Sequence, residues 1–175
     1  MLKYCGVEFE DKMYPVTGEP GAWDKTSWTD VKESLGFEYP NLPYMQDGDT
    51  KISETVAIMK YIAKKWDPTL LGNTAAELAR AEMLFAQVYD MKGKATLPAY
   101  MGGKEVDDLK DDIADSVNPI LAKFVEVTQD SKWLAGETLT WVDFYYAELI
   151  EYMDTVLDGR ITAEFPATRD YLERF

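Results

Sequence analysis

One dipeptide, Asp67-Pro68, divides this chain into two parts with different apolar patterns. Before it, short apolar stretches alternate with turn-forming residues, a pattern typical of strands and hairpins. After it, apolar residues recur every three or four positions, which indicates helices. Because proline disfavours helical backbone in the residue before it, a helix is expected to end there. We therefore predict a small α/β domain over residues 1–66, a linker over residues 67–73 and an all-helical domain over residues 74–175.

The first part contains signals for a strand, a hairpin and a helix. Gly6 is typical of a helix end, so the chain is expected to begin inside a helix. Val7, Phe9 and Met13 fit the two-residue period of a strand, which predicts a strand over Val7–Tyr14. Asp47-Gly48, followed by Asp49, predicts the turn of a hairpin. From Glu54 onward the apolar spacing changes to that of a helix.

In the second part, capping signals mark where helices begin. Thr74 and Glu77 have the spacing of a capping box, in which each side chain bonds the other residue's backbone N–H. Thr140 and Asp143 repeat this spacing before a later helix. A helix is also predicted over residues 105–128, where Pro119 would kink it. A last helix is expected to reach the end of the chain.

Charge and composition exclude several classes of function. The chain has 32 acidic and 18 basic residues and a net charge of −14, which repels nucleic-acid phosphates. It has no histidine, so Ser-His-Asp and Cys-His nucleophiles and most zinc sites are excluded, and we expect no metal. The single cysteine, Cys5, cannot form a disulfide framework. The absence of an apolar leader and of a run of about 18 apolar residues predicts a cytoplasmic protein with no membrane partner.

Four segments carry a resemblance to a known family. They read Trp23-Asp24-Lys25-Thr26-Ser27-Trp28 with Lys32 beyond it, Tyr39-Pro40-Asn41-Leu42-Pro43-Tyr44, Ile52-Ser53-Glu54-Thr55-Val56-Ala57-Ile58, and Gly136-Glu137-Thr138-Leu139-Thr140-Trp141-Val142-Asp143. Their order and spacing resemble the mu-class cytosolic glutathione S-transferases over nearly the whole chain. The resemblance implies an α/β thioredoxin-like N-terminal domain followed by an all-α helical-bundle domain.

The sequence departs from the family pattern at both ends. Family members begin with a strand that carries a catalytic tyrosine, and they continue beyond the point where this sequence stops. That strand lies in the middle of the family's sheet, so without it the strand predicted over residues 7–14 loses its neighbour. The sequence is then either a fragment, or a rearranged fold compensates. Tyr4 and Cys5 lie in the remnant of the first helix, and we assign the catalytic role to no residue of this sequence.

The resemblance places the γ-glutamyl end of glutathione at the start of a helix. Thr55 and nearby N–H groups would receive the carboxylate, because a helix N-terminus favours anions. Glu54 would accept from the ammonium group. The alternative is that both side chains only cap the helix.

The middle of glutathione would lie against Asn41, Leu42 and Pro43. The family keeps the peptide bond before this proline in the cis form, which turns the backbone of Leu42 toward the ligand. Asn41 carries over as a further contact. The alternative is an ordinary trans proline in a turn.

The resemblance assigns the glycyl carboxylate to Lys25, Trp28 and Lys32. Trp28 would donate through its indole N–H, and the two lysines would supply charge. Lys25 stands where the family usually has arginine, so it keeps the charge but loses the bidentate hydrogen bonding of a guanidinium group. The alternative is a buried tryptophan beside solvated lysines.

Asp90 aligns with the family aspartate that reaches the glutathione of the partner subunit. It lies two residues beyond the apolar Val88, so it points away from the apolar face of its helix. A solvated surface aspartate is the alternative.

Together these features predict a homodimeric enzyme that joins the thiol of glutathione, its co-substrate, to hydrophobic electrophiles in detoxification, without a further cofactor. A non-catalytic relative that binds glutathione or another ligand is the alternative. A thiol oxidoreductase on the same fold ranks last, because Cys5 lies next to the helix stop rather than at a helix start.

Overall fold

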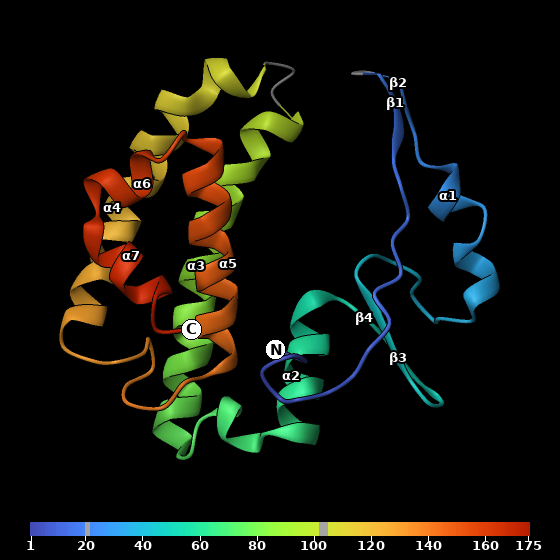
Figure 1. Cartoon of the computed structure of the whole chain (residues 1–175), viewed down its shortest axis with the longest axis horizontal. Coiled ribbons are helices and arrows are strands. Elements are labelled where there is room, and N and C mark those ends of the chain that lie inside the picture. Colours follow the sequence, from blue (N-terminus) through green and yellow to red (C-terminus); the bar gives the residue numbers. More distant parts are fainter. Residues whose placement is uncertain (20–21, 102–104) are drawn as a thin grey trace. The chain divides into compact units, whose positions relative to one another are not determined.

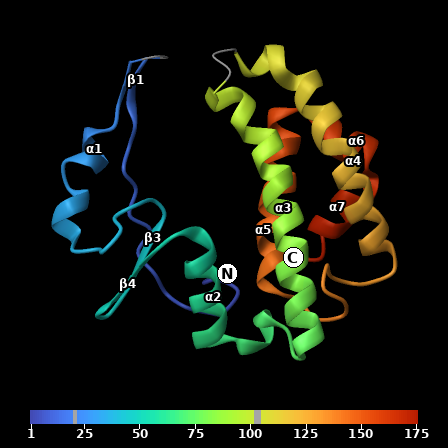
Figure 2. The same ribbon diagram turned by 180° about the vertical axis from the view of Figure 1, so that it is seen from behind.

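The computed structural model describes residues 1–19, 22–101 and 105–175, with the backbone alone at residues 99–101. The chain separates into two compact units, Met1–Asp67 and Pro68–Phe175. Figures 1 and 2 show strands and short helices in the first unit and only helices in the second. No described helix is both long enough and apolar enough to cross a bilayer.

The first unit contains two separate antiparallel hairpins. β1 (Thr17–Glu19) pairs with β2 (Ala22–Asp24), and β3 (Tyr44–Asp47) pairs with β4 (Thr50–Ser53). The second hairpin confirms the predicted turn, whose two loop residues are Gly48 and Asp49. Gly48 has a φ of 59°, a conformation that glycine adopts without steric cost.

The predicted strand over residues 7–14 is wrong. This segment runs in no regular element, and Phe9 and Met13 are 47% and 77% exposed. A strand needs a hydrogen-bonded neighbour, and none of the described strands pairs with residues 7–14. Residues 1–6 form a hydrogen-bonded turn rather than a helix, in which the Cys5 N–H bonds the Met1 carbonyl at 3.0 Å and Gly6 has a φ of 67°.

Three helical segments complete the first unit. They are α1 (Thr26–Thr29), η1 (Lys32–Leu35), which is a 3₁₀ turn, and α2 (Thr55–Trp66). α2 packs against the β3–β4 hairpin. Of the hydrophobic side chains described in this unit, only Ile62 and Ala63 are fully buried, and both belong to α2. The first unit therefore has a small core.

Pro68 begins a further 3₁₀ turn, η2 (Pro68–Leu71), so the predicted linker contains regular structure. Leu70 in this turn is only 1% exposed. The segment thus packs with the second unit rather than crossing between units as an irregular loop.

The second unit is a bundle of helices. Its elements are α3 (Ala75–Met101), η3 (Val106–Leu109), α4 (Lys110–Gln129), α5 (Trp141–Val156), α6 (Arg160–Glu164) and α7 (Pro166–Leu172). α3 lies between α4 and α5 and contacts both (Figures 1 and 2). Trp141, Val142 and Ile150 of α5 have no exposed surface, so this helix is central to the core.

Both predicted capping boxes are present. Glu77 N–H donates to Thr74 Oγ1 at 3.1 Å, and Thr74 N–H donates to Glu77 Oε2 at 3.2 Å. At α5, Thr140 N–H donates to Asp143 Oδ2 at 2.7 Å. These reciprocal bonds satisfy N–H groups that a helix start otherwise leaves unpaired.

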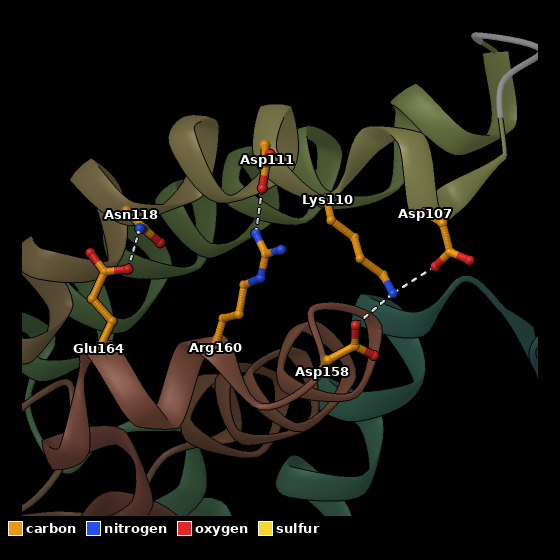
Figure 3. Close-up of polar contacts among 7 residues, drawn as sticks. All are labelled: Asp107, Lys110, Asp111, Asn118, Asp158, Arg160 and Glu164. Atoms are coloured by element: carbon orange, nitrogen blue, oxygen red, sulfur yellow. Dashed lines mark hydrogen bonds and ion pairs between the residues drawn. The ribbon is translucent and has the colours of Figure 1, made fainter.

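A row of polar contacts joins α4 and η3 to the residues around α6, and we call it the α4–α6 polar seam (Figure 3). It consists of Lys110 with Asp107 and Asp158, Arg160 with Asp111, and Asn118 with Glu164. Lys110 Nζ lies 2.6 Å from the Asp107 carboxylate and 2.7 Å from that of Asp158. Both carboxylates raise the pKa of Lys110, so its charge persists.

Candidate functional site

The start of α2 leaves backbone donors available. Ile58 N–H bonds the Glu54 carbonyl at 3.0 Å, while the N–H groups of Thr55, Val56 and Ala57 donate to no atom of the described chain. No side chain caps this helix by a hydrogen bond. The alternative that Glu54 and Thr55 serve only as capping residues is therefore not supported. Such a helix start attracts a carboxylate.

Glu54, the residue before α2, has an uncommon backbone conformation. Its φ is 75°, in the left-handed region that non-glycine residues rarely adopt. Residues held in this way concentrate at ligand-binding positions, where the surrounding structure stabilises them. Here the Glu54 carboxylate accepts a hydrogen bond from Asn41 Nδ2 at 3.1 Å.

Asn41, Leu42 and Pro43 therefore lie beside the start of α2. Asn41 Oδ1 also accepts from the Leu42 N–H at 2.9 Å, so the Asn41 amide bridges Leu42 and Glu54. The Leu42–Pro43 peptide bond is cis, as the resemblance implied. The structure thus brings three of the predicted site residues, Asn41, Leu42 and Glu54, into one hydrogen-bonded group, with Pro43 and Thr55 next to them in the chain.

Trp28 lies on α1 within an aromatic cluster formed by Tyr14, Trp28, Phe37 and Tyr44. The Trp28 ring stacks on Tyr44 at 6.0 Å between centroids and meets the edge of Tyr14 at 5.1 Å. Its indole N–H donates to no atom of the described residues, so it is available to a ligand. The Trp28 ring can therefore pack in the cluster while its indole N–H remains free to donate to a ligand.

Tyr14 and Tyr44 are members of this cluster that the sequence did not single out. Their hydroxyl oxygens lie 2.9 Å apart, and this hydrogen bond raises the pKa of Tyr44 to about 12. Tyr44 therefore stays protonated at neutral pH and holds the ring stack rather than serving as a base. The only signal for it in the sequence was its place directly after Pro43.

The two predicted lysines lie on either side of Trp28 along the chain. Lys25 precedes α1 and is exposed, with no described carboxylate paired to it. Lys32 begins η1, and its Nζ lies 3.6 Å from a carboxylate oxygen of Glu33. Trp28 and Lys32 are four residues apart but do not share one helix, because α1 ends at Thr29 and η1 starts anew at Lys32. Sequence spacing could not show this break.

Asp90 lies in the second unit, on the exposed side of α3. It lines an open hollow of about 740 Å³ that also includes Tyr89, Lys94, Leu97 and Ser116. Since it belongs to a different unit from the other predicted residues, its role in the same site stays a prediction.

The described residues include no group of three or more acidic or cysteine side chains able to hold a metal ion. What the first unit offers is a helix start with free donors, an amide–carboxylate pair and an indole N–H with nearby lysines. This set suits a flexible ligand with carboxylates at both ends.

Known proteins are similar to this chain in both sequence and fold. The model of the glutathione S-transferase N-terminal domain matches residues 1–64, and that of the C-terminal domain matches residues 88–175. Glutathione S-transferase Mu 1 of Bos taurus is 30% identical over 175 residues, which are the whole chain and 78% of that relative. Glutathione S-transferase Mu 3 of Homo sapiens is 31% identical over the whole chain and 75% of its own length.

Among solved structures, the glutathione S-transferase Blo t 8 superposes with a TM-score of 0.83 at 29% identity, covering 99% of this chain and 78% of that one. The chain therefore belongs to the glutathione S-transferase family. Its fold is that of the family, a small thioredoxin-like β/α domain followed by a helical domain, and the Bos taurus and Homo sapiens relatives named above are mu-class proteins.

Proposed function

We propose that this chain binds reduced glutathione on its first unit and joins the glutathione sulfur to hydrophobic electrophiles. The observation that carries the proposal is the start of α2, where three backbone N–H groups and the Thr55 hydroxyl are unused next to the Asn41–Glu54 pair. A helix start without a side-chain cap can receive a carboxylate from a ligand through its free N–H groups.

In this proposal the three parts of glutathione meet three parts of the unit. The α2 start receives the γ-glutamyl carboxylate, and Glu54 accepts from the ammonium. The backbone of Leu42 and the Asn41 amide face the cysteinyl residue. The indole N–H of Trp28, with Lys25 and Lys32, receives the glycyl carboxylate.

The chemistry needs no further cofactor. The thiol loses its proton to solvent, the thiolate attacks a carbon of the electrophile, and the leaving group departs with the electron pair of the broken bond. The resemblance gives the sulfur-facing hydroxyl to a tyrosine on a strand that this sequence does not include. We assign that role to no residue described above.

The family resemblance further suggests a homodimer in the cytosol, with Asp90 directed toward the partner's glutathione. Size-exclusion chromatography with light scattering tests this directly. A species of twice 19.9 kDa supports the dimer, and a monomer at micromolar concentration contradicts it.

Calorimetric titration with glutathione tests the binding site. The Thr55→Ala variant removes one donor from the carboxylate, so we expect its Kd to rise by roughly five- to tenfold. The exposed Thr50→Ala in β4 is the matched control and should bind like the wild type. Equal affinities of all three proteins would contradict the assignment of the α2 start.

A conjugation assay with 1-chloro-2,4-dinitrobenzene separates the proposal from its alternative, a non-catalytic glutathione-binding relative. Binding with conjugation above the uncatalysed rate supports the transferase. Binding without it supports the alternative.

A further inference from the structure

Strand β4 carries side chains that hold the proposed glutathione-binding segment in place. Side chains of β4 and of the residue after it bind the last residue of η1 and two residues of the segment that joins η1 to β3. Lys51 Nζ donates to the Leu35 carbonyl at 2.5 Å, and Ser53 Oγ donates to the Tyr39 carbonyl at 2.7 Å. Glu54 accepts from Asn41, as described above. The connecting segment is thereby held along the strand.

Lys51 makes the first of these bonds at the carboxyl end of η1. Leu35 is the last residue of this turn, and its carbonyl has no partner within the turn. The partial negative charge at a helix end attracts a cation. The ammonium also lies 5.7 Å from the centre of the Phe37 ring, which adds a cation–π contact.

The backbone around this contact leaves room for the ammonium. Gly36 ends η1 with a φ of 71°, and a Cβ added there would lie 3.0 Å from Lys51 Nζ. A side chain at this position would therefore crowd the ammonium as well as strain the backbone. The contact between Lys51 and the end of η1 thus depends on both residues.

The other end of η1 carries Lys32, which the proposed function places at the glycyl carboxylate. Lys32 and Leu35 are the first and last residues of this single four-residue turn. Because so short a turn has little stability of its own, an anchor at its carboxyl end helps to hold the whole turn, and with it Lys32, in place.

We infer that Lys51 is a positioning residue for the glycyl end of glutathione: it anchors η1 to the hairpin and so sets the place of Lys32, without touching the ligand. The inference rests on the proposed function. It predicts that Lys51 matters for ligands that carry the glycyl carboxylate and not for ligands that lack it.

The test compares two ligands by calorimetry on the full chain. One is glutathione, and the other is γ-glutamylcysteine, which is glutathione without its glycine. We expect Lys51→Met to weaken glutathione binding by roughly three- to tenfold and to leave γ-glutamylcysteine binding unchanged. Lys51→Arg keeps the charge and the donor, so it should restore glutathione affinity to within about twofold.

Two further variants complete the design. Lys64→Met removes an exposed lysine of α2 in the same unit and should change neither affinity. Gly36→Ala crowds the ammonium and strains the left-handed backbone at the end of η1, so it should act like Lys51→Met and provides the test if that variant fails to fold.

The outcomes separate the inference from the proposed function. Equal weakening of both ligands, or of neither, by Lys51→Met and Gly36→Ala overturns the positioning role and leaves the binding site in place. Equal affinity of the wild type for both ligands also overturns it. If the wild type binds neither ligand, the proposed function fails and the inference fails with it.

Discussion

At the scale of single residues, Asp143 is the most heavily bonded side chain described. Its carboxylate accepts from the Leu134 N–H at 2.8 Å, from the N–H and hydroxyl of Thr140, and from the Tyr171 hydroxyl at 2.5 Å. It is completely buried. The capping box accounts for Thr140, while the bonds to Leu134 and Tyr171 join the α5 start to a loop and to α7.

Replacing Asp143 by asparagine should destabilise the second unit by about 2–4 kcal/mol, because an amide presents a donor to groups that need an acceptor. Urea unfolding followed by circular dichroism at 222 nm measures this. The exposed Asp115→Asn in α4 is the control, with a change within about 0.5 kcal/mol. A loss below 1 kcal/mol at Asp143 would show that the network relaxes around the amide.

The stability that this network contributes should decrease as pH rises. Burial raises the pKa of Asp143 above its ordinary value, even though its four donors favour the charged form. The folded protein therefore holds this proton more tightly than the unfolded chain, and ionisation costs stability as pH rises above about 4. The wild type should therefore exceed Asp143→Asn in free energy of unfolding by a smaller amount as pH rises from about 4 toward neutrality. A difference that grows over this range would contradict the raised pKa of Asp143.

At the scale of elements, the α4–α6 polar seam attaches a short helix to a long one. α6 has only five residues and cannot be stable alone, so its contacts with neighbouring elements hold it in place. Lys110, with two carboxylate partners, is the most connected member of the seam (Figure 3). The predicted helix over residues 105–128 contained this lysine, but nothing in the sequence paired it with Asp158.

Lys110→Met should lower the melting temperature, because it leaves Asp107 and Asp158 close together without their shared cation. The decrease should become smaller in 1 M NaCl, since salt screens the repulsion that remains. Differential scanning calorimetry measures both effects. Lys123→Met removes the cation of an exposed pair with Glu126 and is the matched control. The same melting temperature for the two variants would mean that the seam adds nothing to stability.

At the scale of the whole molecule, burial is distributed unevenly between the two units. The fully buried hydrophobic side chains described in the first unit are Ile62 and Ala63, while the second unit buries a continuous set from α3 to α7. Local opening costs less where few apolar contacts are lost.

Hydrogen exchange should therefore divide the chain into two classes. We expect the slowest amides of α5 to exchange roughly 100-fold more slowly than those of the β3–β4 hairpin. Mass spectrometry of peptides from each element measures this. Saturating glutathione should slow the hairpin and the α2 start and leave α5 unchanged, because a ligand stabilises the segment that it orders. Uniform exchange across both units would show that they open together.

The sequence by itself determined several features that depend on neighbours along the chain. The Gly48 turn, the two capping boxes and the apolar faces of α3 to α5 follow from spacing alone, because their partners lie within a few residues. The motif from Asn41 to Thr55 likewise indicated a ligand site, and the structure brings its members together.

Contacts between distant segments were decided only by the tertiary structure. Residues 7–14 have the alternation of a strand, yet without a paired neighbour they form none, because a ladder needs two strands. The stacking of Tyr14 and Tyr44 on Trp28 and the reach of Lys51 to Leu35 join residues that are 14 to 30 positions apart. Such contacts depend on how the whole backbone closes in space, which local spacing does not encode.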